Sequence, residues 1–226
     1  MGAIDKASNI VALCDAIPHS LILEIGAGEG SILKRLSELG FGEELYALEI
    51  SPTGVETIKK RGIPQLTECL QFDGYDIPYN NHKFDLAILS HVVEHVEFPR
   101  KLLYEAARVA RYIFIEVPLE DTVRLKADFV FDKVGHINPY SPKTIRRLTQ
   151  TCNLEVLRQI VTNPSKAVYT YRKGKKGLLL HQGRSVEVFA RSSDKHLNLP
   201  LVIVMSSKEI ETLISRTSGY RTMRCT

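Results

Sequence analysis

Short runs of aliphatic residues alternate along this chain with longer segments in which apolar residues recur every three or four positions. The aliphatic runs predict the strands of a buried sheet, at residues 21–25, 45–50, 65–72, 84–90 and 112–117. The periodic segments predict amphipathic helices at residues 4–17, 31–39, 52–60 and 99–110. Because strands and helices alternate in strict order, the pattern predicts an α/β fold with a parallel, doubly wound sheet.

The pattern is looser in the second half of the chain. Residues 119–140 are irregular and predict an insertion, after which a serine–proline pair begins another helix. Residues 154–161 predict a sixth strand. The next strongly apolar run, at residues 200–205, predicts strand seven, so residues 163–198 are expected to form a second insertion.

The turn after the first strand carries glycine at every second position, at Gly26, Gly28 and Gly30. Glycine lets the backbone turn tightly and approach a ligand without a Cβ in the way. A strand, a glycine-rich turn and a helix in this order are typical of a nucleotide site at the carboxyl edge of a sheet. The spacing differs from the G-x-G-x-x-G dinucleotide fingerprint, because Ser31 stands where the third glycine would be.

The charges around this turn indicate which ligand it takes. Glu24 ends the strand and Glu29 lies in the turn, so a pyrophosphate would face carboxylates. A ligand with an ammonium, a carboxylate and a sulfonium fits better, because Glu24 attracts the ammonium while N–H groups at the helix start hold the carboxylate. Glu49 ends the second strand, where an acid can accept hydrogen bonds from both hydroxyls of a ribose. Taken alone, the first motif is also compatible with a glycine-rich turn that binds nothing.

The stretch E-x-G-x-G-x-G at residues 24–30 resembles the first motif of the class I S-adenosylmethionine-dependent methyltransferases. With Asp73-Gly74 after the third strand and H-x-x-E-H at residues 91–95, the chain is similar to the small-molecule group of that family over residues 21–160. The resemblance implies a Rossmann-like fold with a seven-stranded, mostly parallel sheet and an antiparallel last strand. It also implies S-adenosylmethionine as cofactor, S-adenosylhomocysteine as product, and O- or N-methylation of a small-molecule acceptor.

The same resemblance implies the contacts to the cofactor, residue by residue. Asp73 would contact the adenine amino group, with the Gly74 backbone beside it. The implied cofactor-binding residues are Glu24, Gly26, Ala27, Gly28, Gly30, Glu49, Ile50, Asp73, Gly74, Ser90 and His91. Two other functions stay open: an RNA 2′-O-methyltransferase-like enzyme, and a non-catalytic scaffold that only binds the cofactor.

A second constellation follows the fourth strand. His91, Glu94 and His95 share a face if this segment is helical, and His136 follows the fifth strand at the same edge of the sheet. Three interpretations are open. In the first, these residues serve packing and capping. In the second, His95 or His136 is a general base for an O–H or N–H nucleophile. In the third, all four bind a divalent metal ion.

The metal interpretation rests on a further resemblance. The segment is similar to the E-x-x-E-H motif of small-RNA 3′-terminal 2′-O-methyltransferases and of some quinone-biosynthesis O-methyltransferases. Here His91 stands in place of the first glutamate, and a magnesium site that exchanges a carboxylate for an imidazole is weakened. The sequence therefore favours a chelator-insensitive enzyme, with His95 and His136 as candidate catalytic residues.

Composition sets limits on size and partners. A chain of 226 residues, 44% hydrophobic and 25% charged, suits a single domain over residues 1–226. Residues 1–20 would form an N-terminal helix or lid, and residues 119–140 and 163–198 would cap the substrate. The net charge of +4 is too small for a dedicated nucleic-acid surface, although residues 172–176 are basic. The expected partner is a small molecule, and the expected state is a monomer or homodimer.

The cysteines and the apolar segments bear on location. Cysteine occurs at positions 14, 69, 152 and 225 without a C-x-x-C pair, which predicts reduced thiols in a cytoplasmic protein rather than disulfides or a zinc site. The first 20 residues carry acidic and basic side chains and do not form a signal peptide. No apolar run has membrane-spanning length, so no membrane contact is expected.

Overall fold

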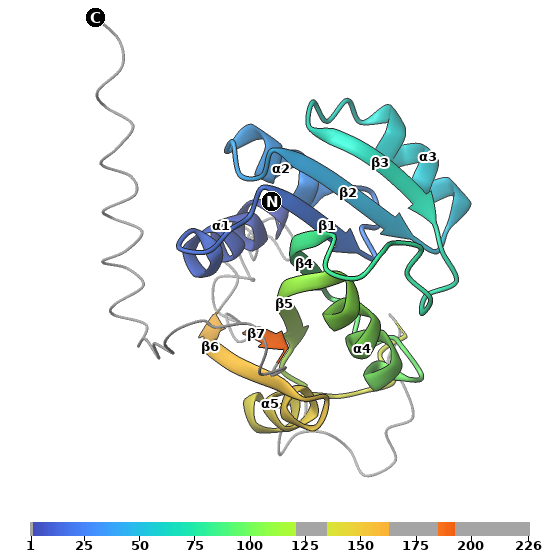
Figure 1. Cartoon of the computed structure of the whole chain (residues 1–226). Helices are drawn as coiled ribbons and strands as arrows, with labels where there is room; N and C mark the ends of the chain where they lie inside the picture. The colour runs from blue at the N-terminus through green and yellow to red at the C-terminus, as the bar shows by residue number, and fades with distance from the viewer. Residues whose placement is uncertain (1, 121–134, 163–184, 193–226) are drawn as a thin grey trace, which may run out of the picture.

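The computed structural model describes residues 2–120, 135–162 and 185–192 of the chain. Strands and helices alternate through most of this length (Figure 1). The strands are β1 (Leu21–Ile25), β2 (Glu44–Glu49), β3 (Leu66–Gln71), β4 (Phe84–Ser90), β5 (Ala110–Pro118), β6 (Leu154–Thr162) and β7 (Ser185–Ser192). The helices are α1 (Gly2–Cys14), α2 (Ser31–Glu38), α3 (Pro52–Lys60), α4 (Pro99–Val109) and α5 (Pro142–Thr151).

The seven strands form one sheet in the order β3-β2-β1-β4-β5-β7-β6. The pairs from β3 to β5 are parallel, and β7 runs antiparallel to both of its neighbours, β5 and β6. This topology confirms the predicted α/β class and the Rossmann-like, doubly wound, mostly parallel sheet with an antiparallel last strand. The strand order reverses between β1 and β4, which is where a sheet of this kind opens a ligand-binding crevice at its carboxyl edge.

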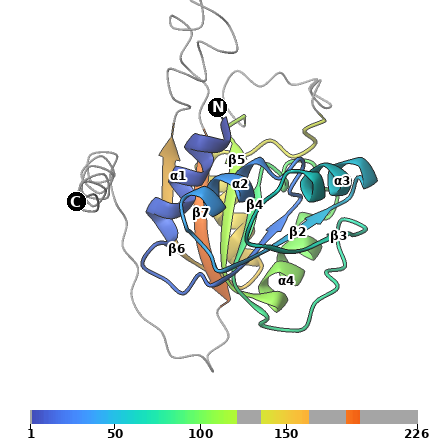
Figure 2. The same cartoon turned by 90° about the horizontal axis from the view of Figure 1, so that it is seen from above.

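Helices cover both faces of the sheet (Figure 2). Helices α1, α2 and α3 pack their apolar sides on one face, where Ile10, Leu33 and Ile58 are fully buried. Helices α4 and α5 pack on the other face through residues such as Leu103 and Ile145. Burial on both faces explains why β1 and β4 are continuous aliphatic runs without the alternation of a half-exposed strand.

The predicted helix starts have the expected caps. The Ser51 hydroxyl accepts a hydrogen bond from the Gly54 N–H at 3.3 Å, and Pro52 takes the first helical position of α3. Helix α5 begins in the same way at Ser141, where a reciprocal capping box with Thr144 satisfies two backbone N–H groups. These local signals are the reason why both starts could be located from the sequence.

The position of strand seven was wrong in the sequence-based prediction. The strand that completes the sheet is β7 at Ser185–Ser192, inside the segment 163–198 that the pattern assigned to an insertion. Val188, Phe189 and Ala190 are buried between the two helical layers. The predicted strand at residues 200–205 and the basic stretch at 172–176 lie outside the described residues, as does most of the insertion expected at 119–140.

Helix α1 is part of the core. Ala7, Ile10 and Cys14 are fully buried against α2 and the sheet, and the side chain of Lys6 points toward the carboxyl edge of β5. Cys14, Cys69 and Cys152 are buried free thiols, as expected. None of the helices in the described ranges has the length and apolarity needed to cross a membrane.

Candidate cofactor site and histidine cluster

The glycine turn lies between the carboxyl ends of β1 and β2. The N–H groups of Gly26 and Ala27 both donate to the carbonyl of Leu48, at 2.8 and 3.0 Å, which ties the turn to the second strand. Gly28 has a φ of +57° and open space where a Cβ would stand, so a ligand can approach its backbone closely. The turn ends at Gly30, which lies in the left-handed region and precedes the first turn of α2.

Glu49 braces this turn from the end of β2. Its Oε2 accepts a hydrogen bond from the Gly28 N–H at 2.8 Å, and its Oε1 accepts one from the Ser51 N–H at 3.0 Å. The carboxylate is 8% exposed, and each of its oxygens keeps a further lone pair. A carboxylate fixed by two backbone donors is well suited to accept hydrogen bonds from hydroxyl groups of a ligand.

Glu24 lies deeper, at the end of β1. It is 2% exposed, and its Oε2 has no hydrogen-bond partner among the described residues. Burial raises the pKa of Glu24 to about 8, against the opposing effects of the Lys6 ammonium and of the backbone N–H of Leu33. A buried carboxylate without a partner is costly to a protein, and a cationic ligand would remove most of that penalty.

Glu116, next to the end of β5, organises a second buried network that the sequence did not reveal. The β4–β5 register sets it opposite Ser90, whose hydroxyl donates to Oε2 of Glu116. His91 has a φ of +57° and donates its backbone N–H to the Glu116 carbonyl at 2.9 Å. The Lys6 ammonium lies 3.8 Å from Glu116 Oε2, so helix α1 also contributes to the network.

The imidazole of His91 bridges two buried carboxylates. Its Nδ1 lies 3.0 Å from Glu94 Oε1, and its Nε2 lies 3.8 Å from Glu116 Oε1. Burial favours the neutral imidazole, but Glu116 and Glu94 outweigh it and raise the pKa of His91 to about 9. Burial alone would raise the pKa of Glu116, whereas the neighbouring His91 and Lys6 hold it below its usual range. The edge therefore combines several carboxylates with two cations of the chain itself.

Comparison with known proteins identifies the domain that carries this edge. Residues 23–112, which include the glycine turn, Glu49 and His91, match the family described as "Methyltransferase domain". Over these residues the chain is therefore similar to a methyltransferase domain.

Similar proteins include one curated relative and many solved structures. The uncharacterized protein MJ1123 of Methanocaldococcus jannaschii is 32% identical over 105 residues, which are 46% of this chain and 46% of that protein. The match thus spans about half the length of the curated relative.

Two solved structures illustrate the shared fold. The [4+2]-cyclase SpnF has a TM-score of 0.63 at 14% identity, over 83% of this chain and 81% of that one. The N-terminal domain of EvdMO1, crystallised with S-adenosylhomocysteine and D-fucose, has a TM-score of 0.55 at 16% identity, over 85% and 83%. At these identities the likeness concerns the fold alone. SpnF, for example, is named for a cyclisation and not for methyl transfer.

The cofactor of the methyltransferase domain is S-adenosylmethionine, and the chemistry of this edge fits it. The unpartnered oxygen of buried Glu24 suits an ammonium group, and the fixed carboxylate of Glu49 suits ribose hydroxyls. Glu29, by contrast, is paired with other side chains of the protein. Its carboxylate pairs with Arg61 at 2.9 Å and accepts a hydrogen bond from the Ser31 hydroxyl. The charge argument against a pyrophosphate therefore depends on Glu24 and Glu49.

The adenine end of the methyltransferase site is more open. Asp73 forms a turn in which its Oδ1 accepts hydrogen bonds from the N–H groups of Tyr75 and Asp76, at 2.8 and 2.7 Å. These backbone donors hold the pKa of Asp73 below its usual value. Ile50 is 59% exposed, and its side chain lies beside Gly74, where an added Cβ would be 3.6 Å from Cγ2. An exposed apolar side chain next to an acidic turn can contact a planar base and its amino group.

His95 and His136 lie next to each other, and His91 is linked to them through Glu94. Glu94, His95 and His136 offer ligand atoms that all lie within 4.8 Å of one another. The rings of His95 and His136 meet edge to face, with centroids 4.7 Å apart. His91 instead lies between Glu94 and Glu116. Three of the four residues named from the sequence therefore offer clustered ligand atoms, and the fourth, His91, contacts one of them.

Two further residues of the methyltransferase site were missed. Glu116 is an acid in an otherwise apolar strand, which is a signal that a closer inspection of residues 112–117 could have used. Gly54 lies in α3, where an added Cβ would be 2.6 Å from Glu49 Cγ and 2.9 Å from the Gly28 carbonyl oxygen. Only the packing of α3 against the turn reveals its importance.

Proposed function

We propose that this protein transfers a methyl group from S-adenosylmethionine to an oxygen or nitrogen of a small-molecule acceptor. The observation that carries the proposal is the Glu24 carboxylate, buried and without a partner for Oε2 among the described residues, beside a glycine turn braced by Glu49. A site built only for packing would not retain a buried acid that lacks a partner, because replacement of that acid by a neutral residue would stabilise the fold.

In this proposal each part of the edge holds one part of the cofactor. Glu24 receives the ammonium, N–H groups at the start of α2 receive the carboxylate, and Glu49 receives the ribose hydroxyls. Asp73, Gly74 and Ile50 contact the adenine. The turn at Ser90 and His91 closes the site on the β4 side, where Val92 packs so closely on Gly26 that an added Cβ there would be 2.7 Å from Val92 Cγ2.

When bound, S-adenosylmethionine supplies a methyl group on a sulfonium, which is already activated for in-line displacement by a nucleophile. The chain contributes orientation and exclusion of water. The acceptor must also lose a proton from its O–H or N–H group. The cluster Glu94, His95 and His136 is where we place that step, either because an imidazole takes the proton or because an ion held there lowers the pKa of the acceptor.

The charge of the site favours a small molecule over RNA. The described edge gathers the carboxylates of Glu49, Glu94 and Glu116 and the buried acid Glu24, against the cations of Lys6 and protonated His91. A polyanionic acceptor would be repelled by such an edge, since RNA binding depends on contacts from basic groups to phosphates. An RNA methyltransferase is the alternative, and nucleic acid that copurifies with the protein, seen in the ratio of absorbance at 260 and 280 nm, would favour it.

Binding of S-adenosylhomocysteine tests the proposal first. A ligand that binds only the folded protein, at 100 times its Kd, stabilises it by about 2.7 kcal/mol. For a domain of this size the melting temperature should rise by about 5–10 °C. NAD at the same concentration should have no such effect. If neither cofactor form binds to correctly folded protein, the enzyme proposal fails. If both bind but no acceptor in a metabolite pool is methylated, the scaffold alternative gains.

Replacement of Glu49 by alanine should weaken S-adenosylhomocysteine binding by about 1.5–3 kcal/mol, the usual range for hydrogen bonds to a charged acceptor. The loss has two origins, since Glu49 is proposed to hold the ribose and also anchors Gly28 and Ser51. Isothermal titration calorimetry measures the change. Glu56→Ala is a matched control, because Glu56 is an exposed acid of α3 paired only with Lys60 among the described residues. Equal affinity in Glu49→Ala and the wild type would show that the ribose is held elsewhere.

A further inference from the structure

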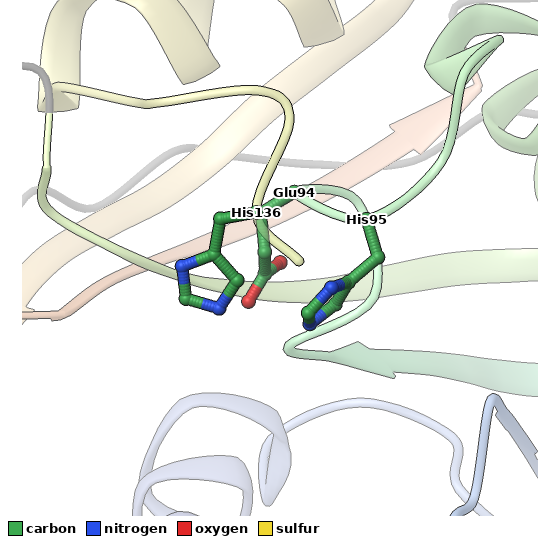
Figure 3. Close-up of side chains that lie close together, drawn as sticks. All are labelled: Glu94, His95 and His136. Carbon is green, nitrogen blue, oxygen red and sulfur yellow. The ribbon is translucent and has the colours of Figure 1, made fainter. Parts of the chain in front are cut away.

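The cluster Glu94, His95 and His136 joins two loops at the carboxyl edge of the sheet. Glu94 and His95 follow β4, and His136 follows β5 after an intervening segment. Figure 3 shows the Glu94 carboxylate pointing into the space between the two imidazole rings. The three ligand atoms lie within 4.8 Å of one another. Donor atoms bound to one ion at about 2.0–2.2 Å are at most about 4.4 Å apart, so an ion bound here would draw these three groups slightly closer together.

Glu94 is the most deeply buried member of the cluster, and within the described ranges its carboxylate lacks the hydrogen bonds that a buried acid normally has. It is 0% exposed, and neither of its carboxylate oxygens has a hydrogen-bond partner of good geometry among the described residues. Its closest cation is the His91 imidazole, 3.0 Å from Oε1. One imidazole cannot satisfy both oxygens of a fully buried carboxylate, so Glu94 retains at least one oxygen without a partner among the described residues. A buried acid in this position is expected to be paired with a cation.

Both histidines are oriented as metal ligands usually are. Nδ1 of His136 lies 2.8 Å from Oε2 of Glu120, and Nδ1 of His95 lies 3.2 Å from the carbonyl oxygen of Gly135. Both partners are acceptors, so each Nδ1 carries the proton, and each ring then has its lone pair on Nε2. Metal-binding histidines typically donate their second N–H to a carboxylate or a backbone carbonyl in this way.

The two loops are held in a fixed relation without any ion. The carbonyl of Glu94 accepts hydrogen bonds from the N–H groups of Ile137 and Asn138, at 2.9 and 3.1 Å. The Asn138 side-chain amide donates to the carbonyl of Val96 at 2.7 Å. These bonds connect the loop after β4 directly to the loop that carries His136. The geometry of the cluster is therefore set in advance by the backbone, as a binding site requires.

We propose that Glu94, His95 and His136 form a binding site for one divalent transition-metal ion. The sequence favoured a metal-free enzyme because His91 stands where a magnesium ligand would be expected. The structure removes the basis of that argument, since His91 faces Glu94 and Glu116 and is not one of the three clustered groups. Two imidazoles and one carboxylate suit Mn²⁺, Fe²⁺, Co²⁺ or Zn²⁺ better than Mg²⁺ or Ca²⁺.

The site also narrows the class of acceptor, an inference that rests on the function proposed above. Three protein ligands leave coordination positions for groups of the substrate. An acceptor hydroxyl that occupies one of them loses its proton more readily, because the ion stabilises the alkoxide or phenolate. The released proton goes to solvent, and the oxygen then becomes the nucleophile toward the methyl group. The metal site therefore points to O-methylation of a hydroxyl compound, with His95 and His136 as ligands and not as bases.

Direct metal binding tests the site without use of activity. Tag-free protein, stripped with a chelator, is titrated with Mn²⁺ and Zn²⁺ by calorimetry and with Co²⁺ by visible absorption. One equivalent should bind to the wild type. His95→Ala, His136→Ala and Glu94→Gln should each bind at least about 100-fold more weakly, and Glu120→Ala about 10- to 100-fold more weakly through loss of the acceptor for His136 Nδ1–H. His82→Ala should bind like the wild type, since His82 is exposed and outside the cluster.

Binding of S-adenosylhomocysteine to each variant separates this proposal from the previous one. His95 is exposed, so its replacement should leave both folding and S-adenosylhomocysteine affinity intact. Absence of stoichiometric binding to the wild type, or equal metal affinity in the wild type, His95→Ala and His136→Ala, would overturn the metal site. Metal binding that depends on these residues in a protein that does not bind S-adenosylhomocysteine would retain the site but reject the methyltransferase function and the acceptor class derived from it.

Discussion

Replacement of Glu24 by glutamine is expected to weaken cofactor binding about 10- to 100-fold and, at the same time, to stabilise the free protein. The loss of affinity follows from removal of the carboxylate proposed to pair with the cofactor ammonium, because hydrogen bonds between charged groups contribute about 1.5–3 kcal/mol. The gain in stability follows from burial. Glu24 is 2% exposed with an unpartnered Oε2, and a neutral isostere does not have to be transferred from water as an anion.

The effect on stability should depend on pH in a defined direction. Burial raises the pKa of Glu24 to about 8 in the folded protein, from the 4.5 that is usual for an exposed glutamate. The folded state therefore holds this proton more tightly than the unfolded state, and the contribution of Glu24 to the free energy of unfolding falls as pH rises from about 4.5 to 8. At about 1.4 kcal/mol for each pKa unit, the total change is several kcal/mol. The free energy of unfolding of Glu24→Gln should lack this decline with pH. The variant should therefore be more stable than the wild type by the largest margin above pH 8.

Cofactor binding at pH 7 should release a proton from Glu24, because the free protein holds it and a bound ammonium would expel it. Calorimetry in buffers of different ionisation enthalpy measures this release, which should be absent in Glu24→Gln. Glu43→Gln removes the same charge from an exposed position at the opposite edge of the sheet and serves as the control. A Glu24→Gln protein with wild-type affinity and wild-type pH dependence would show that Glu24 is not the ammonium site.

The parts of the fold predicted correctly are those determined by short stretches of sequence. Strand β4 at Phe84–Ser90 and helix α3 at Pro52–Lys60 were predicted with the bounds that the structure has. The first depends on a continuous aliphatic run and the second on a serine–proline cap, and both signals lie within a few residues of the element that they mark. The glycine turn was found for the same reason, since its three left-handed glycines follow directly on β1.

Strand β7 was misplaced because its position depends on partners far away in the sequence. It pairs with β5 and with β6, so both of its edges are hydrogen-bonded. Its own sequence mixes apolar residues with Glu187 and Arg191, and Arg191 lies close to Glu155 of β6, with 2.8 Å between Arg191 Nε and Glu155 Oε2. The run at residues 200–205 is more uniformly apolar and therefore matched the local criterion better. Register between distant strands decides such cases, and it is not contained in local hydrophobicity.

The positions of the acidic residues at the site could be predicted from the sequence, but the contacts among the site residues could not. Glu24 and Glu49 lie at the carboxyl ends of apolar strands, so their position at the carboxyl edge could be inferred from the chain. The role of Glu116 appears only when β4 and β5 are paired, because the pairing sets Ser90 opposite Glu116. In the same way, His91 was grouped with Glu94 and His95 by spacing, whereas its positive φ and its contact with Glu116 orient the ring differently.

Gly54→Ala should also disrupt cofactor binding, although alanine normally favours a helix by about 0.5–1 kcal/mol over glycine. A Cβ at residue 54 would lie 2.6 Å from Glu49 Cγ and 2.9 Å from the carbonyl oxygen of Gly28. The second contact is with backbone, so it cannot be relieved by rotation of a side chain. Either α3 moves away from the turn, or Glu49 and Gly28 shift and their 2.8 Å hydrogen bond is lost.

Both responses displace the group proposed to hold the ribose. We therefore expect S-adenosylhomocysteine affinity to fall about 10- to 100-fold, in line with the 1–3 kcal/mol that overpacking usually costs. Titration calorimetry measures the affinity, and thermal unfolding shows whether the fold has also lost stability. Gly2→Ala is the matched control, since it adds the same methyl group to helix α1, where nothing lies within 4 Å. If Gly54→Ala leaves the affinity unchanged, binding of the ribose does not require Glu49 and the glycine turn to be held in place by α3.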